Sequence, residues 1–86
     1  MFRKAIADDY ALHIKPCNQI HMLNMRFAID VIYLDRAFNV VKVDRDVQPG
    51  KICKTVKAAH SVIEVRSGTA SKLGIQQGDT LEIEER

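Results

Sequence analysis

The sequence predicts a mainly β fold: a small antiparallel β sandwich or barrel-like domain with one short helical turn near the C-terminus. Five or six short segments rich in β-branched residues follow one another closely, and turn signals containing glycine or proline separate several of them. Strands alternating with full helices are absent, which excludes a doubly wound fold. The 86 residues, 47% of them hydrophobic, suffice for one core, so we expect a single domain over residues 1–86.

The N-terminal part has the least regular pattern. Residues 3–12 predict a short helix with a narrow apolar face, although Asp8 and Asp9 would lie in its interior. Pro16 favours extended geometry at Lys15 and has no N–H to donate, so no helix continues across it. Two strands rich in Ile, Val, Met, Phe and Tyr are then expected at residues 19–25 and 27–35, followed by a turn at 35–39.

The middle of the chain alternates strands with turns. Residues 40–47 have the β-branched content of a strand, and the sequence Gln48-Pro49-Gly50 ends it with a turn. A brief pairing is predicted at residues 52–56. Residues 61–66 predict a further strand.

One helical turn and one strand close the chain. The turn is expected at residues 69–73, with Thr69 as its cap and Gly74 as its left-handed stop. In the last strand, residues 80–84, Leu81 and Ile83 would face the core.

The charge balance narrows the partner classes. Thirteen Lys and Arg side chains against eleven Asp and Glu give a formal net charge of +2, far from the strongly basic balance typical of binding to phosphate backbones. Residues 42–57 hold a local excess of positive charge, but no aromatic side chains are interspersed for base stacking. We interpret this segment as a solvated face, and nucleic acid is not the expected partner.

The apolar runs, the N-terminal segment and the number of cysteines predict the localisation and the state of the thiols. The chain has no run of about 18 apolar residues, so no membrane span is expected, and two aspartates in MFRKAIADDY argue against a signal peptide. We therefore expect a cytoplasmic protein. Cys17 and Cys53 are too few for a disulfide framework. Both would be free thiols in a reducing compartment, and a single bridge between them stays open.

A set of residues resembles a known family in order and spacing. These are Pro16-Cys17, Ile20-His21, Met25, Phe27, Ile29-Asp30-Val31, Leu34-Asp35, Val40, Pro49 and the segment VIEVRSGTASKLGIQQGDTLEI. From about Arg3 to Ile83 they are similar to the bacterial and archaeal family called domain of unknown function 192. The resemblance implies a small, mainly β, sandwich-like domain without an established activity.

The same resemblance implies an additional strand ahead of Arg3, where this sequence begins. If that strand is missing, an edge of the sheet is exposed and self-association is favoured. Secretion stays open in the same case, because the native N-terminus would then be missing.

The stretch HIKPCNQIH spaces His13, Cys17 and His21 four residues apart, which on a helix would place all three on one face. Pro16 argues against that helix. On a strand each four-residue step covers about 13 Å, whereas zinc ligands lie about 2.0 to 2.3 Å from the metal. We therefore predict no metal site.

A second interpretation treats Cys17 as a nucleophile, His21 as its base and Asp30 as the orienting group. Such a cysteine needs a thiolate stabilised by a cation or a helix N-terminus, and the sequence supplies no oxyanion-hole motif. The structural alternative is that Asp30 is buried and ties a neighbouring loop through backbone hydrogen bonds.

A binding pocket is the preferred site. On a regular strand the side chains of His21 and Met25 project from the same face, and His21 and Asp30 would supply convergent polar groups. Glu64 faces either this region or solvent. The predicted ligand-binding residues are His21, Met25, Asp30, Cys17 and Glu64.

The sequence thus favours a non-catalytic β module of otherwise unknown function that binds a small molecule or a protein, without a cofactor. The alternative is a small thiol-dependent or metal-assisted enzyme that uses Cys17, His21 and Asp30. Weak RNA binding through the lysine-rich segment is a third interpretation, and it predicts an affinity that falls steeply with salt.

Overall fold

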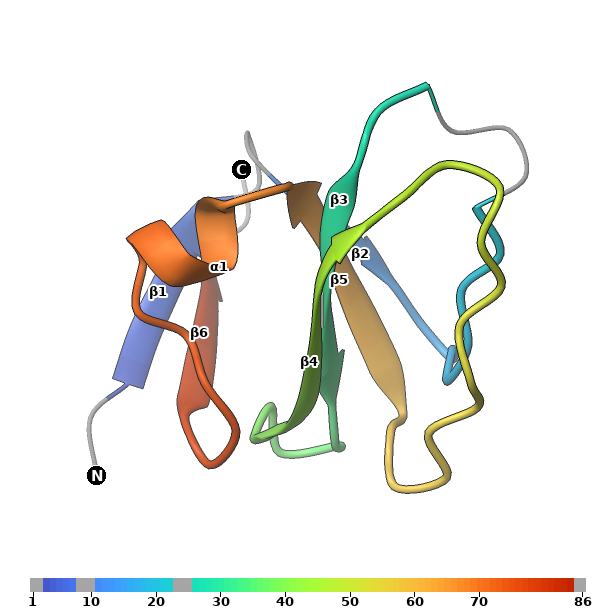
Figure 1. Cartoon of the computed structure of the whole chain (residues 1–86). Coiled ribbons are helices and arrows are strands. Elements are labelled where there is room, and N and C mark those ends of the chain that lie inside the picture. Colours follow the sequence, from blue (N-terminus) through green and yellow to red (C-terminus); the bar gives the residue numbers. More distant parts are fainter. Residues whose placement is uncertain (1–2, 8–10, 23–25, 85–86) are drawn as a thin grey trace.

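The computed structural model describes residues 3–7, 11–22 and 26–84. It confirms a mainly β fold with an antiparallel sheet and a short helix late in the chain (Figure 1). The elements are β1 (Arg3–Ala7), β2 (Ala11–Ile14), β3 (Ile29–Leu34), β4 (Val40–Val47), β5 (Ser61–Arg66), α1 (Thr69–Lys72) and β6 (Thr80–Glu84).

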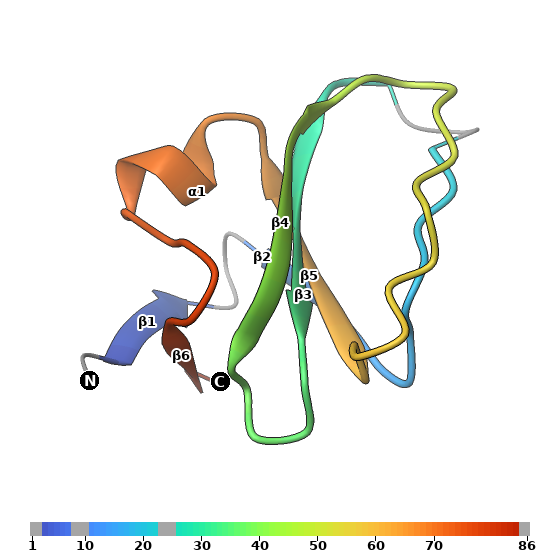
Figure 2. The ribbon, with the colours of Figure 1, turned by 60° about the horizontal axis from the view of Figure 1, so that its bottom comes forward.

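The strands form two sheets. Four of them make an antiparallel sheet in the order β2-β5-β3-β4, and β1 pairs in parallel with β6. Figures 1 and 2 show β1, β6 and α1 on one side of the four-stranded sheet, and residues 15–22 and 50–60 on its other side. We call these sides the helix face and the loop face.

Both faces of the central strand β3 are covered, and all six of its side chains are buried. A strand enclosed in this way has a continuous apolar sequence instead of an alternating one. Alternate residues of β3 then belong to different cores. Ile32 and Leu34 pack with Ala70, Ile75 and Leu81 on the helix face. The loop-face core consists of Ile20, Met22, Ile29, Val31, Tyr33, Val47, Cys53 and Val62.

The helix predicted at residues 3–12 is wrong. The described part of this segment forms β1, which pairs with β6 from Arg3↔Thr80 to Ala7↔Glu84, and the start of β2, which pairs with β5. These partners lie far away along the chain, and such pairing overrides a weak local helical pattern.

Residues 19–25 do not form the predicted strand in their described part. His21 makes a single antiparallel bridge with Ile52, which confirms only the brief pairing predicted at residues 52–56. Further backbone hydrogen bonds run from Cys53 N to Ile20 O (2.9 Å) and from Met22 N to Lys51 O (2.7 Å). The loop-face cover is therefore two irregular segments held side by side.

The helical turn is confirmed, but its predicted cap is wrong. Gly68, with φ 91°, occupies the N-cap position, and no side chain from that position bonds to the helix. Asp30 of β3 accepts the hydrogen bond from the Ala70 N–H instead, at 2.9 Å. Gly74, with φ 67°, ends the turn in the left-handed region as predicted.

Candidate functional site

Asp30 is a buried anchor between three elements. Its side chain lies on the helix face and is 1% exposed. Oδ1 accepts from the Asp46 N–H at 2.9 Å, and Oδ2 accepts from the Ala70 N–H at 2.9 Å. The carboxylate therefore ties β3 to both β4 and α1 through main-chain donors, as the structural alternative from the sequence expects.

Cys17 and His21 lie on the opposite side of the sheet from Asp30. The Cys17 thiol packs against the loop-face core and donates to the Gln19 carbonyl at 3.2 Å, and the His21 side chain is exposed. Because the sheet separates the two sides, Asp30 cannot orient His21. Among the described residues no group of three or more His, Cys, Asp or Glu side chains could hold a metal ion.

Met25 and Glu64, the other two residues of the predicted pocket, do not join Asp30 in a common site. Met25 lies outside the described residues. Glu64 of β5 pairs with Leu12 and Val31, on the loop face, and is half-buried. Burial raises its pKa above the ordinary value. Asp30 therefore shares no concavity with the predicted residues on the loop face.

The burial of Glu64 gives a pH-dependent prediction. Its folded-state pKa exceeds the unfolded value, so the stability that its protonated form provides is complete below the unfolded pKa and is lost as pH rises through the folded pKa. We expect Glu64→Gln to raise the free energy of unfolding by about 0.5 kcal/mol at pH 7 and to change it little at pH 3. Urea unfolding at both pH values tests this, with exposed Glu82→Gln as the matched control. A destabilised Gln variant at pH 7 would contradict it.

A cleft of about 610 Å³ opens on the loop face beside β4. Residues 42–48 form one wall and residues 51–54 form the other. We call it the β4 cleft. Its volume falls in the range of about 300 to 1,000 Å³ that is usual for ligand sites.

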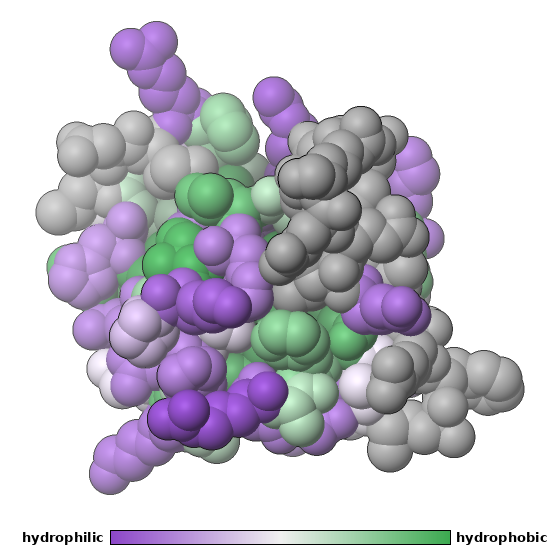
Figure 3. All heavy atoms as spheres, turned by 180° about the vertical axis from the view of Figure 1, so that it is seen from behind, coloured by the Kyte–Doolittle hydropathy of each residue, from purple (hydrophilic) through white to green (hydrophobic). Residues whose placement is uncertain are grey.

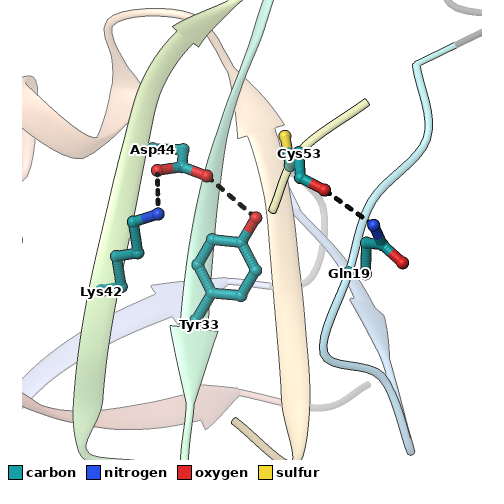
Figure 4. A network of polar contacts seen from close by, with 5 residues as sticks. All are labelled: Gln19, Tyr33, Lys42, Asp44 and Cys53. Atoms are coloured by element: carbon teal, nitrogen blue, oxygen red, sulfur yellow. Dashed lines mark hydrogen bonds and ion pairs between the residues drawn. The ribbon is translucent and has the colours of Figure 1, made fainter. Parts of the chain in front are cut away.

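A polar network lies beneath the β4 cleft (Figure 4). The hydroxyl of Tyr33, a residue with 0% exposure, donates to Asp44 Oδ2 at 2.9 Å. Lys42 Nζ pairs with Asp44 Oδ1 at 3.2 Å and lies 5.9 Å from the centre of the Tyr33 ring. Burial, followed by the hydrogen bond to Asp44, raises the pKa of Tyr33 well above its ordinary value. Tyr33 therefore stays a hydrogen-bond donor.

Cys53 lines the cleft from the opposite wall and is 5% exposed. The Gln19 side-chain amide donates to its carbonyl at 2.9 Å (Figure 4). Burial raises the pKa of the Cys53 thiol, although the Tyr33 hydroxyl and, more weakly, Lys42 and Lys51 act on it in the opposite direction. A raised thiol pKa is the reverse of what a cysteine nucleophile needs.

The acidic side chains along the β4 cleft have bonding partners, whereas two of the basic ones do not pair with a carboxylate. Both carboxylates have partners: Asp44 in the network just described, and Asp46 through the Ser67 hydroxyl at 2.6 Å. The Arg45 guanidinium is bonded away from the cleft, to Ser71 Oγ at 3.1 Å and the Ile75 carbonyl at 2.7 Å. In the described part of the chain, the ammonium groups of Lys51 and Lys54 have no carboxylate partner.

A second hollow, of about 500 Å³, lies where the turn at residues 35–37 meets residues 57–60. Burial alone would raise the pKa of Asp35, but hydrogen bonds from Asn39 and Ala37 outweigh it and hold this pKa below its ordinary value. The Asp35 carboxylate therefore stabilises the turn in which it lies and is already hydrogen-bonded. This leaves the β4 cleft as the better candidate for a site.

The family model described as DUF192, uncharacterized ACR, matches residues 1–83. The chain belongs to the DUF192 family. Its fold is similar to the crystal structure of a protein of unknown function from Novosphingobium aromaticivorans, with a TM-score of 0.73 and 23% identity. That match covers 93% of this chain and 61% of the other, and at this identity it shows the fold alone. The search of curated proteins found no match.

Sequence reasoning missed the central residues of the cleft in this DUF192 protein. The charge excess at residues 42–57 was visible, but Tyr33 and Cys53 carry no local signal because they meet only when residues 51–54 fold over β3. Alternation along β4 places Lys42 and Asp44 on one face and could have indicated the ion pair. No helix in the described residues is long and apolar enough to cross a membrane.

Proposed function

We propose that this DUF192 protein is a non-catalytic binding module whose β4 cleft receives an anionic ligand. The observation that carries the proposal is the unequal charge of the cleft. Its two carboxylates are already bonded, whereas Lys51 and Lys54 lack a carboxylate partner in the described residues. The lining as a whole has four basic side chains against two carboxylates, and a concave surface with such an excess of positive charge concentrates anions.

Binding without chemistry agrees with the state of the polar side chains. The Cys53 thiol has a raised pKa because of burial, and the Tyr33 hydroxyl is held by Asp44. Asp30, the third member of the thiol-enzyme alternative, bonds main-chain groups on the other side of the sheet. No contact in the described residues supplies a thiolate and its base together, so the enzyme alternative gains no support.

The test is an NMR titration of ¹⁵N-labelled protein with citrate and pyrophosphate at low ionic strength. We expect amide shifts confined to residues 42–48 and 51–54, and an affinity that falls as salt is added. Lys51→Ala/Lys54→Ala should weaken binding about tenfold, since hydrogen bonds to charged groups contribute about 1.5 to 3 kcal/mol each when buried and less when exposed.

The matched control is Lys57→Ala/Lys72→Ala, which removes the same charge at exposed positions outside the cleft walls. It should change the affinity less than twofold. Equal losses in the two double variants, or no cleft shifts at millimolar citrate and pyrophosphate, would contradict the proposal.

A further inference from the structure

The β4 cleft runs along an open sheet edge. β4 is the terminal strand of the order β2-β5-β3-β4. At its start the edge is used, because Val40 N donates to Asp79 O at 2.7 Å and Gly78 N donates to Val40 O at 2.9 Å. Beyond Val40, no main-chain hydrogen bond outside the pairing with β3 reaches residues 41–45 from any described residue.

The lining of the cleft also points to exposed main chain. Every residue from 42 to 48 borders it, although successive side chains of a strand point to opposite faces. Val43 packs against the helix-face core, and Arg45 bonds to Ser71 and Ile75 on the helix face. At these two positions main-chain atoms are therefore what the strand offers to the cleft.

We propose that an extended acidic peptide adds to the free edge of β4, with its main chain pairing along residues 42–45 and its carboxylates facing Lys42, Lys51 and Lys54. This rests on the proposed function and specifies the anionic ligand. Strand addition of this kind draws affinity from main-chain hydrogen bonds and specificity from alternate side chains. Register shifts flank Lys42–Asp44, so the regular pairing is short.

Charge selects an acidic peptide over other occupants. Pairing of two β4 edges from two copies would bring their basic cleft walls together, and lysine on an edge strand disfavours such association. A compact anion can pair with Lys51 and Lys54 but leaves the main-chain groups of residues 42–45 unused, whereas an extended peptide can use both. Seen from behind, the surface mixes hydrophobic and hydrophilic residues (Figure 3).

The test uses three capped hexapeptides at low salt, followed by NMR: one alternating glutamate with valine, the same peptide N-methylated at alternate residues, and one alternating lysine with valine. N-methylation preserves charge but blocks strand pairing. We expect the acidic peptide to bind at least tenfold more tightly than its N-methylated form and to slow amide hydrogen exchange within residues 42–45. The lysine peptide should not bind.

Matched charge reversals complete the design: Lys51→Glu/Lys54→Glu should abolish binding of the acidic peptide, whereas Lys57→Glu/Lys72→Glu should retain it. Equal affinity of the two glutamate peptides would overturn strand addition. Citrate binding without peptide binding would overturn this inference alone, and failure of both ligands would also remove the proposed function. A single-stranded RNA that binds the cleft more tightly than the peptide would overturn the choice of partner.

Discussion

Asp30→Ala is expected to lower the free energy of unfolding by about 2 to 4 kcal/mol, because it leaves the buried Ala70 N–H and the partly buried Asp46 N–H without their acceptor. The side chain is 1% exposed, and both of its oxygens are used, by the N–H groups of Asp46 and Ala70. The loss would loosen β4 and α1 together, since the two elements are joined through this carboxylate. Urea unfolding followed by circular dichroism measures the change.

Two further variants make the Asp30 result interpretable. Asp30→Asn keeps one acceptor oxygen but turns an amide NH₂ toward the other main-chain donor, so we expect an intermediate cost of about 1 to 2 kcal/mol. Its value stays measurable if the alanine variant is largely unfolded. Exposed Glu82→Ala removes the same charge and should stay within about 0.5 kcal/mol of the wild type. If Asp30→Ala were no more destabilising than Glu82→Ala, Asp30 would not anchor β4 and α1 to β3.

The sequence predicted those elements whose signals are local. The bounds predicted for β4, β5 and β6 agree with the structure, because β-branched content and adjoining turns mark them within a few residues. β1 could not be found in this way, since its partner β6 lies more than 70 residues away and its own sequence has no strand alternation. Its strand geometry is a tertiary effect.

The candidate site was predictable only in parts. A carboxylate inside the apolar run Ile29-Asp30-Val31 indicates a buried, hydrogen-bonded aspartate, and that interpretation holds. Its donors, in β4 and α1, depend on how three elements pack and leave no mark in the sequence. The pocket predicted around His21 assumed a regular strand there. Backbone bonding to residues 51–53 forms an irregular segment instead, and the hollow lies beside β4.

Tyr33→Ala is the second change with a large expected effect, a loss of about 3 to 5 kcal/mol in the free energy of unfolding. Tyr33 is completely buried and belongs to the loop-face core together with Met22 and Cys53. Removing the ring leaves a cavity that the segments over β3 can fill only by collapsing inward. Urea unfolding measures the loss, and an altered dependence on urea concentration would report a change in compactness as well.

Tyr33→Phe separates the hydroxyl from the ring. It should cost only about 1 to 1.5 kcal/mol, because Asp44 keeps its ion pair with Lys42 after losing the hydroxyl donor. In a double-mutant cycle with Asp44→Asn, we expect a coupling energy of at least about 0.5 kcal/mol between the two side chains. If Tyr33→Phe were as costly as Tyr33→Ala, the hydrogen bond and not the packing of the ring would dominate. If Tyr33→Phe left the free energy of unfolding unchanged and the coupling energy with Asp44→Asn were zero, the Tyr33 hydroxyl would not stabilise Asp44. Asp44 would then be held by Lys42 alone, and the apolar core would determine the shape of the β4 cleft.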